Sequence, residues 1–110
     1  MTAMEEKLYR QLVDQAFARI DAAFEDVDPD LAESSLSQGT LTITFNNRFR
    51  FIVSPQTPVR QIWVAFRDRA WHLNYNSETQ SWNDDKGQGV ELYRLVETTT
   101  QEQAQLKIEV

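Results

Sequence analysis

Acidic side chains crowd one short stretch of the chain, FEDVDPDLAE at residues 24–33. The five carboxylates in these ten residues are Glu25, Asp26, Asp28, Asp30 and Glu33. Carboxylate oxygens are hard donors, which suit cations such as iron, manganese, magnesium or calcium and do not select zinc. No Lys or Arg occurs between Arg19 and Arg48 to neutralise them. The stretch is therefore either a solvated acidic face or a surface that attracts a cation or a basic partner.

The residues around this stretch predict an amphipathic helix over residues 4–28, which contain no Gly or Pro and end before Pro29. Its apolar face repeats every four residues at Leu8, Leu12, Ala16, Ile20 and Phe24. At about 100° per residue, the acids on the opposite face are Asp14, Asp21, Glu25 and Asp28. Negative charge is unfavourable at a helix C-terminus, and like charges four residues apart repel. Helix stability alone does not explain why acids occupy this position.

After Gly39 the apolar period changes to two, which predicts antiparallel strands. The predicted strands are TLTITF at 40–45, RFRFIV at 48–53, QIWVAF at 61–66, AWHLNY at 70–75 and a short one at QSW, 80–82. A second helix is predicted from about Val90, burying Leu92, Leu95 and Val96, with the acids of DDKGQG as its cap. A helix, a meander of strands and a second helix predict an α+β fold whose two helices cover one face of the sheet.

Trp63 is the anomaly of the predicted sheet, because the alternation that buries Ile62, Val64 and Phe66 turns Gln61 and Trp63 outward. An exposed Trp with polar neighbours is typical of binding surfaces. The alternative is a Trp half covered by Arg stems or by a neighbouring loop. The single His, His72, also points outward and is interpreted as a surface residue, whereas Trp71 and Trp82 are assigned to the core.

Length and composition limit the classes of function. A chain of 110 residues with 41% hydrophobic residues predicts a single folded domain over residues 1–110. A net charge of −6 argues against nucleic-acid binding. The absence of Cys excludes disulfides and thiolate chemistry. Without a long apolar run or a basic, apolar leader, we expect a cytoplasmic protein that does not enter the membrane.

Several motifs in this order resemble those of the frataxin family, and in particular its bacterial branch. They are LTITF, SPQTPVRQIWVAF, WHLNY, an isolated Trp and GVELYRLV, preceded by a helix with an acidic end. The most specific part is QTPVRQIW, which contains Gln56, Pro58, Gln61, Ile62 and Trp63. The resemblance covers nearly the whole chain and implies two helices packed on an antiparallel sheet.

The resemblance also implies a function: an iron-binding regulator or adaptor of iron–sulfur cluster assembly that contacts the cysteine desulfurase and the scaffold protein. Transferred residue by residue, the iron-binding acidic surface is Asp21, Glu25, Asp26, Asp28, Asp30 and Glu33, with Asp14 on the same helix face. The residues implied in partner contact on the sheet face are Gln56, Gln61 and Trp63. The segment LAESSLSQG departs from the bacterial pattern, because it supplies only Glu33 where several acids are usual.

Ligands spread along an exposed surface do not form a closed coordination shell, so we expect weak, labile binding of Fe²⁺ or Fe³⁺ at several positions. The protein is expected to be a monomer that metal could drive into oligomers, with no catalytic residues. Two alternatives stay open. One is a ferroxidase or iron-storage protein, although a di-iron centre normally combines Glu and His within a helical bundle, and this chain has one His. The other is a protein-interaction module that works without metal through Trp63.

Overall fold

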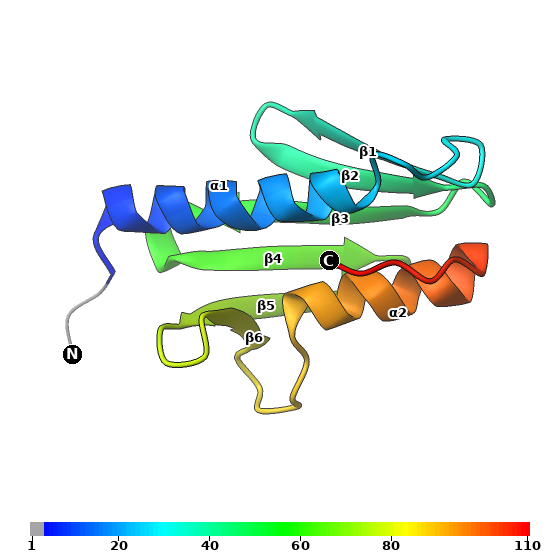
Figure 1. Ribbon diagram of the computed structural model, residues 1–110. Coiled ribbons are helices and arrows are strands. Elements are labelled where there is room, and N and C mark those ends of the chain that lie inside the picture. The colour runs from blue at the N-terminus through cyan, green and yellow to red at the C-terminus, as the bar shows by residue number, and fades with distance from the viewer. Residues whose placement is uncertain (1–3) are drawn as a thin grey trace.

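The computed structural model describes residues 4–110 and confirms the predicted α+β architecture (Figure 1). The elements, in chain order, are α1 (Glu6–Ala23), β1 (Ala32–Ser37), β2 (Thr40–Phe45), β3 (Arg50–Gln56), the 3-10 turn η1 (Thr57–Val59), β4 (Gln61–Phe66), β5 (Arg69–Asn76), β6 (Ser81–Asp84) and α2 (Leu92–Ala104).

The sheet is a six-stranded antiparallel meander in which every strand pairs with the next along the chain. Each apolar side chain of β2 therefore faces the same way as its partners on β1 and β3. The β1–β2 hairpin closes on the pair Ser37 and Thr40, so that its loop consists of Gln38 and Gly39. Both loop residues have positive φ, 53° and 80°, as a two-residue hairpin turn of this kind requires.

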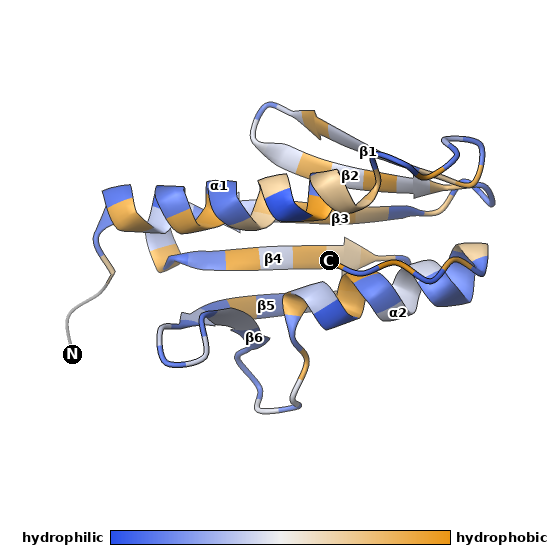
Figure 2. Cartoon of the chain, viewed as in Figure 1, coloured by the Kyte–Doolittle hydropathy of each residue, from blue (hydrophilic) through white to orange (hydrophobic). Residues whose placement is uncertain are grey.

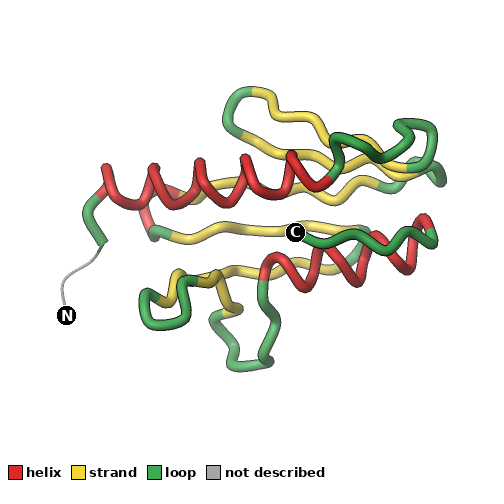
Figure 3. Tube along the Cα trace, in the orientation of Figure 1, coloured by secondary structure: helices red, strands yellow, loops and turns green. Residues whose placement is uncertain are grey.

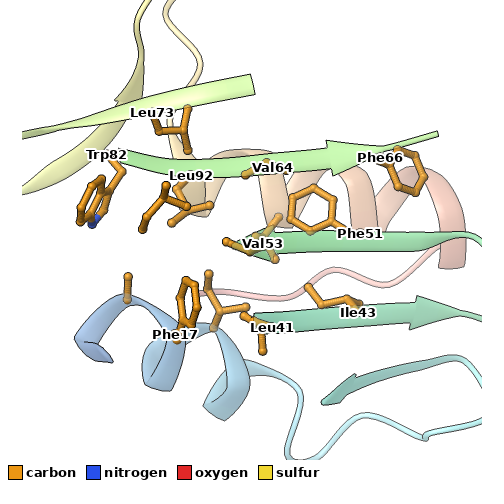
Figure 4. Packing of buried hydrophobic residues seen from close by; sticks show 14 of the residues in the cluster. Phe17, Leu41, Ile43, Phe51, Val53, Val64, Phe66, Leu73, Trp82 and Leu92 are labelled. Atoms are coloured by element: carbon orange, nitrogen blue, oxygen red, sulfur yellow. The ribbon is translucent and has the colours of Figure 1, made fainter. Parts of the chain in front are cut away.

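Both helices lie on one face of the sheet and leave the other face open, as Figure 1 shows. Hydrophilic and hydrophobic residues alternate along both helices (Figure 2), and the apolar ones supply the helix side of the core. Figure 4 shows Phe17 of α1 and Leu92 of α2 among side chains from the sheet. The sheet residues labelled there are Leu41, Ile43, Phe51, Val53, Val64, Phe66, Leu73 and Trp82, all of them buried. Trp71 is also buried, as the sequence predicts.

The predicted end of the first helix is wrong: α1 ends at Ala23, and Phe24 is its C-cap. The following residues, up to Leu31, form turns that carry the chain from the helix to the sheet (Figure 3). The physical reason lies partly in the acids themselves, since negative charge at Glu25 and Asp26 opposes continuation of the helix at its C-terminal end. Phe24 is buried in the core and fixes the point at which the chain turns.

The apolar periodicity of the sequence is also misleading about the burial of one residue and the existence of one strand. Leu8 lies on the predicted apolar face but is exposed, because the face that packs on the sheet is formed by Tyr9, Val13, Ala16, Phe17 and Ile20. The alternation of apolar residues does not reveal β1, whose sequence AESSLS offers only Ala32 and Leu36 as apolar residues.

The C-terminal segment runs back between the two helices (Figure 1). The carbonyl of Val110 accepts a hydrogen bond from the Arg19 guanidinium at 2.9 Å, and its N–H donates to Glu97 at 3.0 Å. Arg19 belongs to α1 and Glu97 to α2. The last residue therefore links the two helices to each other.

Candidate functional site

The acids implicated by the sequence lie on three consecutive elements. Asp14 and Asp21 are on α1, Glu33 is on β1, and the remaining four lie in the connection between them: Glu25, Asp26, Asp28 and Asp30. All except Asp21, which is half-buried, are exposed. We call the set Asp21, Glu25, Asp26, Asp28, Asp30 and Glu33 the acidic surface. Asp14 lies two helical turns before Asp21, away from the connection.

A surface depression brings three of these acids together. Asp21, Glu25 and Glu33 line it together with Ser34, and its remaining lining is formed by the apolar side chains of Phe24, Val27, Pro29 and Ala32. The Ser34 hydroxyl donates a hydrogen bond to the Asp21 carboxylate at 2.5 Å, which fixes the helix end against the edge of the sheet. The lining of this edge depression therefore combines carboxylates with apolar side chains.

Asp28 has a local structural role in addition to its charge. Its carboxylate accepts a hydrogen bond from the backbone N–H of Asp30 at 2.9 Å, and its carbonyl accepts from Leu31 and Ala32. These bonds form the turn that leads into β1. Asp26 and Asp30, by contrast, direct exposed side chains away from the protein interior.

The structure does not gather the acids into a coordination shell. Within residues 4–110, no group of three or more Asp, Glu or His side chains is arranged closely enough to hold a metal ion. The acidic surface is thus a set of carboxylates that do not share a common coordination site and are mostly exposed to solvent. Such an arrangement attracts cations through its summed potential and lacks the geometric selectivity of a closed site.

The open sheet face carries a second group of candidate residues around Trp63, whose side chain has 36% relative exposure. Its indole Nε1–H donates to Oε1 of Gln61 at 2.8 Å, and its ring stacks on His72 at 4.2 Å between centroids with an interplanar angle of 16°. The amide nitrogen of Gln61 donates to Asn74 and to Asp85 at 3.1 and 3.2 Å. We call Gln61, Trp63, His72 and Asp85 the sheet-face cluster.

Sequence reasoning placed Trp63 and Gln61 outward but did not connect them with His72 and Asp85. The signal was available in part, because the antiparallel register sets Trp63 opposite His72. Asp85 reaches the cluster only through the path of the loop after β6, where its carboxylate lies 3.9 Å from Nδ1 of His72. Gln56, the third residue implied in partner contact, is half-buried at the end of β3 and pairs with Gln61 in the register.

The loop after β6 is organised by Asp84. Its carboxylate accepts hydrogen bonds from the backbone N–H groups of Gln88, Val90 and Lys86. These bonds, that from Gln88 foremost, hold the pKa of Asp84 below its usual value. The prediction that this acid pair caps the next helix is wrong, since Glu91 is the N-cap of α2 and accepts from the N–H groups of Tyr93 and Arg94.

The fold of two helices on one face of an antiparallel meander, with an acidic helix end and an exposed Trp on the open face, matches one protein family. Residues 2–106 match the model of the frataxin-like domain, and the chain belongs to this family.

Among its relatives is the iron–sulfur cluster assembly protein CyaY of Pseudomonas fluorescens Pf-5, which is 34% identical over 97% of this chain and 96% of the relative. The protein of the same name from Pseudomonas aeruginosa is 35% identical over 77% of this chain and 78% of its own length.

Solved structures agree on the fold. Frataxin from Psychromonas ingrahamii superposes with a TM-score of 0.86 at 24% identity, covering 96% of this chain and 97% of that one. Trimeric yeast frataxin complexed with ferrous iron gives a TM-score of 0.68 at 18% identity, covering 96% and 91%. At these identities the likeness establishes the architecture alone. Within the part of the chain that the structure describes, no helix is both long and apolar enough to cross a membrane.

Proposed function

We propose that this protein is an iron-binding regulator of iron–sulfur cluster assembly. In this proposal the acidic surface attracts iron weakly and contacts the cysteine desulfurase, while the sheet-face cluster, with Gln56, contacts the scaffold protein. The relatives named as iron–sulfur cluster assembly proteins support a role in that process, and the one from Pseudomonas fluorescens Pf-5 matches over 97% of this chain. The cytoplasm is the compartment in which we place this activity.

The observation that carries the proposal is the segregation of charge. Residues 20–47 contain acids and no Lys or Arg, and the structure arranges these acids over the end of α1, the connection and β1. None of the acidic-surface residues takes part in an ion pair within residues 4–110. Their charge is therefore available to an external cation or to a basic patch of a partner.

In this proposal iron is the cargo of the protein and not a resident cofactor. Carboxylates supply the hard oxygen donors that iron accepts, and water fills the positions that the separated side chains leave open. Because no three groups converge within residues 4–110, each ion is held by few protein ligands and exchanges readily. Weak, labile binding at more than one position follows, which suits a protein that passes iron on or senses its level.

The experiment is an amide-resolved NMR titration with Fe(II) without oxygen, combined with a binding assay for the desulfurase. The test variant carries Asp21→Asn, Glu25→Gln and Glu33→Gln. A matched control carries Glu78→Gln, Glu102→Gln and Glu109→Gln, which removes the same charge from exposed acids elsewhere. In the parent protein we expect Fe(II) to broaden the amide signals of residues 21–33 and to leave those of Trp63 unaffected. We expect the test variant, and not the control, to lose both this broadening and its binding to the desulfurase.

Retention of desulfurase binding and of iron-dependent broadening in the test variant would overturn the proposal. Broadening centred on His72, Asp84 and Asp85 would also overturn it, because the metal would then lie beside the sheet-face cluster and not on the acidic surface.

A second candidate is an interaction module that needs no metal. The separation of the carboxylates within residues 4–110 favours it, together with the ordered surroundings of Trp63. One measurement separates the two candidates: the affinity for the desulfurase and for the scaffold, each measured once with Fe(II) and once with a chelator. Affinities that do not change between the two conditions support the interaction module. Oxidation of Fe(II) to Fe(III) faster than in buffer without protein would instead support a ferroxidase.

A further inference from the structure

The two edges of the sheet differ in how they are protected. At the β6 edge, Asn83 forms a bridge with Glu91, and the N–H of Asp84 donates to the carbonyl of Val90 at 2.9 Å. The segment before α2 therefore covers this edge. At the opposite edge β1 is the outermost strand (Figure 3), and among the strands of residues 4–110 it pairs with β2 alone. One edge of the sheet is closed by its own chain and the other is open.

The register shows which backbone groups of β1 face outward. Ser37 and Thr40 close a two-residue hairpin, so they form a hydrogen-bonded pair, and bonded pairs alternate along the strand from there. The N–H and C=O groups of Ala32, Ser34 and Leu36 therefore point away from β2. The bond from the N–H of Ala32 to the carbonyl of Asp28, 3.2 Å long, agrees with this assignment. Within residues 4–110, no backbone hydrogen bond beyond the strand occupies the outward groups of Ser34 and Leu36.

The β1 edge lacks the features that usually prevent strand addition. Natural edge strands are commonly protected by charged side chains, Lys above all, by Pro or by a bulge. The strand AESSLS contains no Lys or Pro, its one charged residue is Glu33, and it pairs with β2 without a bulge over its full length. Leu36 adds an apolar side chain with 54% relative exposure beside the outward groups.

The side chains beside this edge specify the charge of the occupant. The edge depression lies at the start of β1 and is lined by Asp21, Glu25 and Glu33 together with apolar side chains that include Phe24 and Val27. A Lys or Arg side chain has a matching form, an aliphatic stem with a charged end. At the other end of the strand Leu36 matches an aliphatic side chain.

We infer that the β1 edge binds an extended, basic segment of a partner protein, which adds a strand to the sheet. Backbone hydrogen bonds to Ser34 and Leu36 hold the segment, a Lys or Arg enters the edge depression, and an aliphatic residue packs on Leu36. The inference rests on the proposed function in so far as the desulfurase is the partner that supplies the segment.

The first test uses the capped hexapeptide Lys-Thr-Val-Thr-Lys-Thr, which places Lys and Val on the same face of an extended strand and Thr on the other. We expect the amides of Ser34 and Leu36 to shift and to exchange more slowly with solvent when the peptide binds. A peptide of the same sequence with alternate amides N-methylated keeps the charge but cannot pair, and the peptide with Glu in place of both Lys residues tests the charge. Equal binding of the methylated peptide, or unchanged exchange at Ser34 and Leu36, would overturn strand addition and leave a purely electrostatic surface.

The second test is the variant Leu36→Pro, with Leu36→Ala as its control. Proline removes an outward N–H and leaves the β1–β2 ladder intact, since the N–H of Leu36 does not face β2. We expect the Pro variant to bind the peptide about tenfold more weakly than the Ala variant, because one hydrogen bond is lost and the strand is stiffened against pairing. Both variants should retain the native pattern of amide shifts in β2 and β3. Equal affinities would contradict the inference, as would dimerisation through β1 in sedimentation, which would make a second copy the occupant.

Failure of this inference can be distinguished from failure of the proposed function by measuring desulfurase binding in both sets of variants. If Leu36→Pro binds the desulfurase normally while neutralisation of Asp21, Glu25 and Glu33 abolishes binding, the proposed function stands and strand addition falls. If neutralisation has no effect, the proposed function falls, and the peptide test alone decides the role of the edge.

Discussion

The acidic surface and the sheet-face cluster are both exterior, but their side chains are held in different ways. In the sheet-face cluster each group has a partner: Trp63 donates to Gln61 and stacks on His72, and Gln61 donates in turn to Asp85. In the acidic surface only Asp21 and Asp28 accept hydrogen bonds from the protein, and within residues 4–110 no three acids lie close enough to hold a metal ion.

The difference indicates two kinds of recognition. A cluster with fixed orientation loses little side-chain entropy on binding and suits a partner of defined shape. A set of exposed like charges gains little from any single contact, acts over a longer range, and accelerates association with an oppositely charged partner. We therefore expect the sheet face to determine how tightly a partner is held and the acidic surface to determine how fast a basic partner arrives.

Replacing Trp63 is expected to give the largest effect. Trp63→Ala should weaken binding of the scaffold protein by about 2 kcal/mol or more, because a central aromatic side chain with fixed orientation is removed. Isothermal titration calorimetry measures the change. The control is Ile52→Ala, since Ile52 is similarly exposed at 37% on the same face. Fe(II) binding should be unchanged in both variants. An equal loss of affinity in the control would show that the cluster has no special role.

Salt should affect the two surfaces unequally. Raising the ionic strength from about 0.01 M to about 1 M shortens the Debye length from about 30 Å to about 3 Å. We expect the association rate with the desulfurase to fall about tenfold or more, measured by stopped flow, whereas the dissociation rate of the scaffold changes little. A similar salt dependence for both partners would remove the proposed distinction.

Asp28 is expected to contribute to stability more than to binding. Asp28→Ala removes the acceptor for the Asp30 N–H, so the free energy of unfolding in urea should fall by about 1 kcal/mol. Asp26→Ala serves as the control, because replacing this exposed neighbour removes the same charge. The opposite ranking, with Asp26→Ala the less stable variant, would contradict the structural role given to the Asp28 turn.

The smallest effect is expected at Asp84, whose pKa is lowered by the backbone N–H of Gln88 and the further N–H bonds of its loop. A carboxyl with a lowered pKa in the folded state contributes stability above its unfolded pKa, near 3.8, and loses it as the pH falls through the folded value. Asp84→Asn should therefore be slightly less stable than the parent at neutral pH, and the difference should shrink on acidification. Urea unfolding of both proteins at neutral and at acidic pH measures this difference in stability. A difference that grows in acid would show that another group dominates.

The strands with alternating apolar residues were predictable because burial on one face imposes a period of two, as in TLTITF and QIWVAF. The outward position of Trp63 followed from the same rule. β1 was missed because only Ala32 of this strand is buried, and the residues that share its face are the polar Ser34 and the exposed Leu36. The end of α1 was misplaced because Pro29 looked like the stop, whereas burial of Phe24 in the core ends the helix earlier.

The residues of the acidic surface were named from the sequence, but their grouping was not. An uninterrupted helix would have placed Glu25 and Asp28 on one face with Asp14 and Asp21. In the structure the connection turns back onto the sheet, so that Asp21 and Glu25 meet Glu33 from β1 in the edge depression.

The sequence by itself determined the fold class, the charge segregation and the outward direction of Trp63, because each follows from the order and period of residue types along the chain. Only the tertiary structure decided that His72 and Asp85 complete the sheet-face cluster, that the acids within residues 4–110 form no metal-binding group and that the β1 edge is open. These properties depend on which segments meet in space, and that is set by the packing of the whole core.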